Sequence, residues 1–149
     1  MSTTAAEALT AIKTQLASGT VPLYWQGDDA PTLPDSPAAF GFVVFNNEGS
    51  GRSPTAFGGG RGANLYRNRA SIEAYIFSPL GEGAEVVMGY AEAVAAKFRS
   101  YRDSDISCSS ADVILIGPGS SLSVPGLSNE VSNYQCAVAE IALHFDQIG

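Results

Sequence analysis

The sequence has few of the residues that build most reactive sites. Its 149 residues include one histidine, two cysteines, two methionines and one tryptophan. There is no second histidine and no Cys-x-x-Cys spacing, so no zinc-ligand motif is present. No run resembles an acidic calcium loop, and there is no Gly-Lys-Ser/Thr phosphate loop. We therefore expect no metal ion, no cofactor and no disulfide framework.

Charge is also scarce, and little of it is positive. Charged residues make up 15% of the chain, with 15 acids against 8 bases and a net charge of −7, whereas a typical domain carries about 25% charged residues. Phosphate contact needs a basic field, so a general nucleic-acid binder and an anionic-membrane binder are disfavoured. With few charges to cover the outside, we expect other protein chains to cover part of the surface.

Long hydrophobic runs are absent as well. The apolar segments are too short to cross a bilayer, and the N-terminus lacks the basic and apolar regions of a secretory signal. We therefore expect a chain that folds in a cytoplasm. The apolar content of 45% argues against disorder of the whole chain and, at this length, favours one domain spanning residues 1–149.

The few bases are concentrated in one part of the chain. Residues 51–70 contain no acid and four arginines, which are Arg52, Arg61, Arg67 and Arg69. The overlapping stretch 46–63 holds six glycines, one proline and the aromatic Phe57, without periodicity. A loop of more than ~12–15 residues is usually functional or disordered, and glycine makes ordering costly. We predict a long Gly-rich loop at about 46–63 that is ordered by something outside the chain.

The hydrophobic pattern predicts two amphipathic helices and several strands. The helices are expected at residues 4–18, where Thr4 and Glu7 have capping-box spacing, and at residues 82–101. Strands are expected at residues 40–45, 65–77, 106–116 and 131–145, after a short extended piece at 21–25. This order predicts an α+β fold, with a mainly antiparallel sheet and two helices packed on one face.

Alternation along two strands predicts which side chains face the core. In the strand at 65–77, the parity expected to face the core carries Tyr66, Ala70, Ile72, Ala74 and Ile76. The other parity carries Arg67, Arg69 and Glu73. The last strand is apolar on both parities, so it is either central or meets another subunit with one face. Cys136 within it is expected to be a small buried hydrophobe.

Candidate chemistry is sparse. His144, with Glu140 on the same strand parity, could serve a small enzyme or a small-molecule binding module, but no nucleophile lies near it in sequence. Residues 58–63 fit a loose dinucleotide-binding pattern, but a strand rather than a helix is expected to follow. We therefore predict no catalytic residue, and contact with neighbouring proteins through five residues: Arg52, Phe57, Arg61, Arg67 and Arg69. A solvated face is the alternative for Arg67 and Arg69.

The order of elements, with several local motifs, resembles the tail terminator (tail completion) proteins of long-tailed phages and phage-like particles. The resemblance includes the N-terminal helix and Trp25 with the Pro-rich run after it, and it continues through Phe40–Val43, Arg69–Phe77, the turn Pro79–Gly83, Ala95–Phe98 and Tyr134–Asp146. The turn before the second helix is its most specific piece. No part of the resemblance is a catalytic signature.

The resemblance implies a structural virion protein and no enzyme. Such a subunit forms a ring, hexameric in this family, that caps the tail tube, ends its polymerisation and joins it to the head. The implied partners are further copies of the chain, the tail tube protein and the head–tail connector, with DNA at most passing through the ring lumen. The implied location is the head-proximal end of the tail, after assembly in the host cytoplasm. A head–tail connector or stopper protein is the alternative within the same class.

Overall fold

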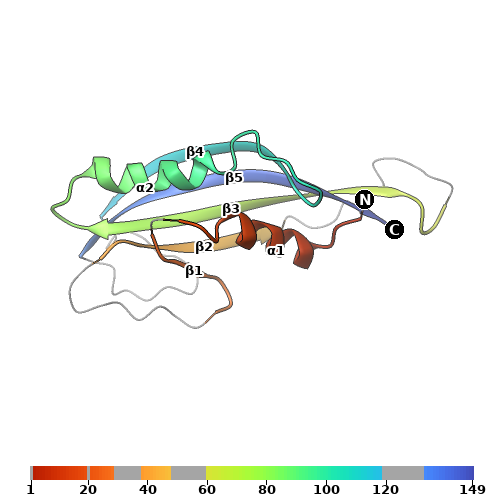
Figure 1. The fold of residues 1–149 in the computed structure, drawn as a ribbon, viewed down its shortest axis with the longest axis horizontal. Helices are drawn as coiled ribbons and strands as arrows, with labels where there is room; N and C mark the ends of the chain where they lie inside the picture. The colour runs from red at the N-terminus through yellow and green to blue at the C-terminus, as the bar shows by residue number, and fades with distance from the viewer. Residues whose placement is uncertain (1, 20, 29–37, 48–59, 119–132) are drawn as a thin grey trace.

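A computed structural model of the chain describes residues 2–19, 21–28, 38–47, 60–118 and 133–149 (Figure 1). Its elements follow in the order α1 (Ala5–Gln15), β1 (Leu23–Trp25), β2 (Phe40–Asn47), β3 (Leu65–Pro79), α2 (Ala84–Ala96), β4 (Ser107–Pro118) and β5 (Tyr134–Ile148). No described helix is long and apolar enough to span a membrane.

One elongated sheet forms the frame of the molecule (Figure 1). Its strand order is β1-β2-β3-β5-β4, with β1 parallel to β2 and every other pair antiparallel. The central strands β3 and β5 pair over 15 residues each, from Leu65 opposite Ile148 to Pro79 opposite Tyr134. The expected α+β fold with a mainly antiparallel sheet is confirmed, and the last strand is central.

Both helices cover the same face of the sheet (Figure 1). Ile12 of α1 and Val87 of α2 share one buried cluster with Ile72 of β3 and Ile141 of β5. The predicted core parity of β3 is correct for Ala70, Ile72, Ala74 and Ile76, which are all buried, whereas Tyr66 near the strand start is only half-buried. A second cluster on the opposite face, near one end, contains Phe40, Phe42, Val44, Phe77, Tyr134 and Cys136. Cys136 is fully buried, and burial raises the pKa of its thiol to about 12.

Local signals explain where the helices begin and end. The Thr4 side chain accepts from the Glu7 amide, and the Glu7 carboxylate accepts from the Thr4 amide, so the capping box is confirmed. The second helix is shorter than the predicted 82–101. Gly83 has φ 96° and cannot belong to a right-handed helix, and Ser100 has φ 57°, which ends the helical path before Tyr101. Phe98 nevertheless remains fully buried beyond the helix end.

The strands are longer than predicted, because hydrogen-bonded pairing continues past the apolar residues. β5 reaches Ile148, and β2 includes Asn46 and Asn47. Gly60 and Gly62 have positive φ in the turn that leads into β3. Most of the expected Gly-rich loop, residues 48–59, lies outside the described residues, and so do Arg52 and Phe57.

Candidate interaction surface

The face of the sheet opposite the helices, called here the outer face, carries its side chains in rows that cross neighbouring strands. Residues two apart on β3 share this face, and the pairing register aligns each with a residue of β5 and β4. The rows differ in charge. An acidic row, a row of small residues and a basic end follow one another along the strands.

The acidic row consists of Glu73 on β3, Glu140 on β5 and Asp112 on β4. Glu73 lies directly opposite Glu140, and Glu140 lies directly opposite Asp112. Directly opposed like charges are destabilising in a sheet. The Tyr75 hydroxyl donates to Oε2 of Glu73 at 2.7 Å, and the negative charge on Glu73 raises the pKa of Tyr75 beyond what burial alone does. The row is therefore a concentration of negative charge held by the strand register.

The small row lies next to the acidic row and consists of Ser71, Ala142 and Ser110, which the register places side by side. A shallow hollow of about 210 Å³ lies over the small row and the acidic row. Ala142 and Ser110 are exposed at its floor. Small side chains beside three carboxylates leave room for a long cationic side chain.

The basic end consists of Arg67, Arg69 and Arg102 around His144. Arg69 lies opposite His144, and Arg67 lies opposite Asp146. Arg67 donates to both carboxylate oxygens of Asp146, at 2.8 and 2.9 Å. This contact lowers the pKa of Asp146. The side chains of Arg69 and Arg102 have no hydrogen-bond or ion-pair partner in the part of the chain that the structure describes.

The structure thus brings together part of the predicted contact set. Arg67 and Arg69 project from the outer face, as predicted, and Arg61 is exposed in the turn before β3. Sequence reasoning missed Arg102, Asp146 and the acidic row as a group. Only strand register places these residues together, because their members are far apart along the chain.

His144 lies at the mouth of a polar notch of about 360 Å³, which Thr3, Arg67, Arg102 and the turn at 103–107 complete. Burial and the neighbouring Arg67 lower the pKa of His144, and Asp146 acts in the opposite direction. No hydrogen bond from a described residue orients the imidazole, whereas a catalytic histidine needs such an orienting partner. Glu140 lies four residues away along the same strand.

The acids of this notch are engaged by the protein itself. Burial opposes ionisation of Asp103, but hydrogen bonds from the amides of Ile106 and Asp105 and from the Tyr101 hydroxyl outweigh it and lower the pKa of Asp103. Asp105 accepts from the Thr3 hydroxyl. Among the described residues, no group of three His, Cys, Asp or Glu side chains could hold a metal ion. The notch therefore has features of an ion-pair network.

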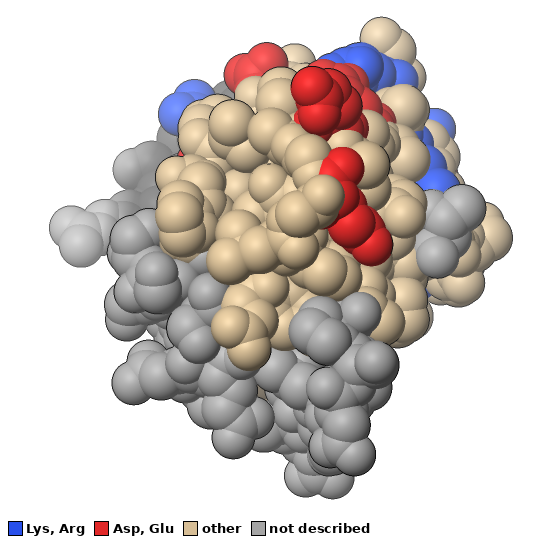
Figure 2. Space-filling model, turned by 90° about the vertical axis from the view of Figure 1, so that its left-hand side faces the viewer, with Lys and Arg blue, Asp and Glu red and all other residues tan. Residues whose placement is uncertain are grey.

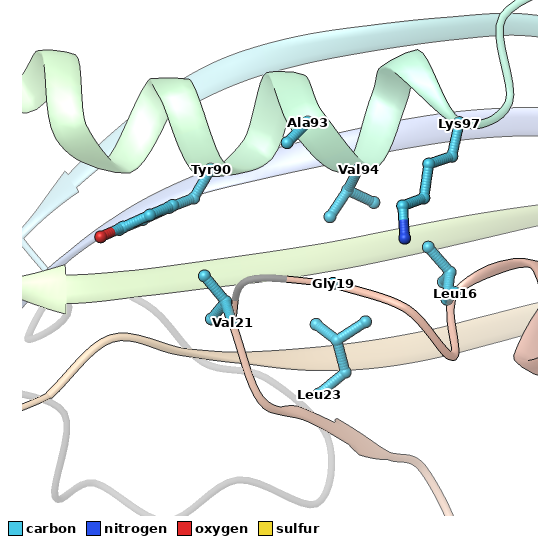
Figure 3. Close-up of a pocket in the computed structure, with 8 residues that line it drawn as sticks. All are labelled: Leu16, Gly19, Val21, Leu23, Tyr90, Ala93, Val94 and Lys97. Atoms are coloured by element: carbon cyan, nitrogen blue, oxygen red, sulfur yellow. The ribbon is translucent and has the colours of Figure 1, made fainter.

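A separate, mostly apolar pocket lies between α2 and the residues that follow α1. Leu16, Val21 and Leu23 line one side of it, and Tyr90 and Val94 of α2 line the other (Figure 3). Its volume of about 20 Å³ is room for about one water molecule.

The described part of one end of the molecule is mostly uncharged, with a few acidic side chains across it and basic ones only at its margin (Figure 2). Here β3 and β4 end, and the exposed apolar residues Leu80, Ile114, Leu115 and Ile116 lie in or near these strand ends. β4 is the last strand of the sheet among the described strands, and the start of its other edge is bridged to Arg102 through Ser107. An edge strand of this kind can pair with another chain.

Comparison with known proteins supports the overall fold and gives no information about function. No protein-family model and no curated protein matches the sequence. The chain is similar to a solved structure whose name states no activity, with a TM-score of 0.53, 13% identity and coverage of 95% of each chain. At that identity the likeness supports the same overall fold only.

Proposed function

We propose that this chain is a tail terminator, a structural protein that assembles as a ring on the tip of a phage-type tail tube. The observation that carries the proposal is the charge pattern of the outer face, with its basic end and its acidic row on one sheet. A cap needs surfaces that its own fold leaves open for identical neighbours and for the tube. In this subunit the helices cover one face only, and the charges of the other face are segregated along the strands.

The proposed assembly is a homo-oligomeric ring, with the hexamer that the sequence resemblance implies. Its partners are the tail tube protein on one side and the head–tail connector on the other. Each contact in a ring is repeated by symmetry, so contacts that are individually weak add up once the tube holds the subunits together. Arginine suits such contacts because its planar fork bonds a carboxylate in two places.

The test is tail assembly with arginine variants. We expect Arg67→Ala/Arg69→Ala/Arg102→Ala to give overlong tails, or tails that fail to join heads, because the basic end no longer docks. The matched control is Arg99→Ala. Arg99 is also exposed and forms an ion pair with Glu92, but it lies next to the α2 end. Tail length and head joining are counted by electron microscopy.

Two outcomes would contradict this proposal in different ways. Normal tail length and joining with the triple variant would reject the basic end as the contact surface. Labelled subunits found on the portal side, with normal tails, would favour a connector or stopper protein instead.

A further inference from the structure

The charge pattern of the outer face is complementary to itself. The small row, Ser71–Ala142–Ser110, lies midway between the acidic row and the basic end. On β3, Glu73 is two residues from Ser71 on one side and Arg69 is two residues from it on the other. On β5, Glu140 and His144 flank Ala142 in the same way. The spacing of two residues keeps all of these side chains on one face.

A twofold axis lying along the small row would therefore superpose opposite charges. Rotation about such an axis turns the face over and reverses the strand direction. The acidic row of one copy then lies over the basic end of the other. Opposite charges meet where Glu73 lies over Arg69 and where Asp112 lies near Arg102, while Glu140 lies over the imidazole of His144, which can donate a hydrogen bond. An axis along the strands would instead place acid over acid. Only the first arrangement relieves the repulsion within the acidic row.

The surface also has the shape for this contact. Sheets pack face to face at about 10 Å, and small residues at the centre allow that approach. The hollow of about 210 Å³ is lined by Glu73, Glu140 and Asp112 next to the small row. Arg69 is exposed and its guanidinium has no hydrogen-bond or ion-pair partner among the described residues, so its long side chain is available to enter the hollow of a second copy.

We propose that two copies of this chain bind through their outer faces as a twofold dimer, with Arg69 of each copy in the acidic hollow of the other. This inference goes beyond the tail-capping role, because it concerns the free chain. Arg67 and Arg69 would serve both surfaces, so the dimer and the cap would exclude each other. The two claims have separate readouts, which are the mass of the free protein and the length of assembled tails.

The experiment is a charge exchange followed by sedimentation velocity, from micromolar to millimolar protein at about 0.1 M salt. At that ionic strength the Debye length is about 10 Å, which screens the net charge of −7 but not a close contact. The wild-type chain is expected to reach twice its 15.4 kDa mass. Arg69→Glu alone and Glu73→Arg alone are each expected to weaken dimerisation about tenfold or more, because each places like charges together twice.

Rescue makes the test independent of folding defects. An equimolar mixture of Arg69→Glu and Glu73→Arg is expected to form 1:1 dimers. In such a dimer one of the two symmetric contacts has its charges reversed, and the other contact keeps the native Glu73 and Arg69. Arg99→Glu on the opposite side is the matched charge control and is expected to dimerise like the wild type. A wild-type chain that stays monomeric, a dimer indifferent to Arg69→Glu, or an absence of rescue would each overturn the proposal. Open chains or rings of the free protein would overturn the twofold geometry in favour of a head-to-tail contact.

Discussion

The two faces of the sheet are built by the same strands and differ most in where they carry charge. The helix-covered face buries Ile72, Ala74 and Ile141 in a cluster that contains no charged residue. On the same strands, the outer face carries Glu73, Glu140 and the arginines, and it has a smaller buried cluster around Phe77 and Cys136 near one end. The comparison indicates that much of the core lies on the covered face, while the outer face, away from its own cluster, carries charges that do not help the isolated subunit.

The comparison is tested most strongly by truncating neighbouring residues of β3 that point to opposite faces. Ile72→Ala removes a side chain that is 0% exposed, and a buried truncation of this kind costs about 2–5 kcal/mol of unfolding free energy. Ser71→Ala, one residue away on the outer face, is expected to change it by no more than about 0.5 kcal/mol. Urea unfolding followed by the fluorescence of Trp25 measures both. Equal losses of unfolding free energy in the two variants would contradict the proposed difference in stability between the two faces.

A second change tests how closely the covered face is packed. An added Cβ at Gly41 would lie 2.5 Å from Cδ2 of Leu23 and 2.8 Å from Cδ1 of Ile76. Ile76 is fully buried and has little room to move. Gly41→Ala is therefore expected to cost about 1–3 kcal/mol by overpacking, measured by urea unfolding.

Gly89 provides the matched control for that substitution. A Cβ at Gly89 would meet nothing within 4 Å, and alanine favours the helix over glycine by about 0.5–1 kcal/mol. Gly89→Ala is therefore expected to stabilise the chain. A neutral Gly41→Ala would show that the β1–β2 edge yields easily.

Much of the covered face could be predicted from the sequence, because its signals are local. Alternation placed Ile72 and Ile76 in the core, and the spacing of Thr4 and Glu7 predicted the first helix start. The second helix was predicted too long, since Phe98 and Tyr101 keep the apolar stripe although the helical backbone has already ended at Ala96. The spacing of hydrophobic residues therefore predicts which side chains are buried better than it predicts whether the backbone is helical.

The outer face could be predicted only in part. The alternation of residues along β3 was enough to place Arg67 and Arg69 on the outer face. The acidic row depends on the register of three strands, and Asp112, which is 39 residues from Glu73, meets Glu140 only after β4 and β5 pair. The contact between Arg67 and Asp146 joins residues 79 apart in sequence. Composition and spacing contain no signal for either group.

A smaller effect is expected from the ion pair between Arg67 and Asp146, which links β3 and β5 on the outer face. Arg67→Met removes the charge that lowers the pKa of Asp146 below its ordinary 3.8. Because the folded pKa is lowered, the stabilisation is present above the ordinary pKa and is lost as the pH falls through the folded value. Arg67 is partly exposed, so the expected loss at pH 7 is about 0.2–1 kcal/mol.

This difference between the wild type and Arg67→Met should shrink when unfolding is repeated below pH 3.8. Arg69→Met is the control, because the structure gives Arg69 no ion-pair partner among the described residues. A loss that does not depend on pH would mean that the methylene groups of Arg67, rather than its charge, stabilise the strand pair.

The smallest expected effect has the opposite sign. Glu140 lies between Glu73 and Asp112, so Glu140→Gln removes both like-charge contacts of the acidic row. In dilute protein, where the chain is monomeric, this change is expected to stabilise the fold by about 0.2–0.5 kcal/mol, and less at high salt. Glu92→Gln is the control, because it breaks the exposed ion pair with Arg99 and should be neutral or slightly destabilising. A stabilised monomer that associates less well would mean that the acidic row weakens the single subunit and serves contact with another chain, whereas a destabilised Glu140→Gln monomer would show that the outer face also supports the fold of the subunit.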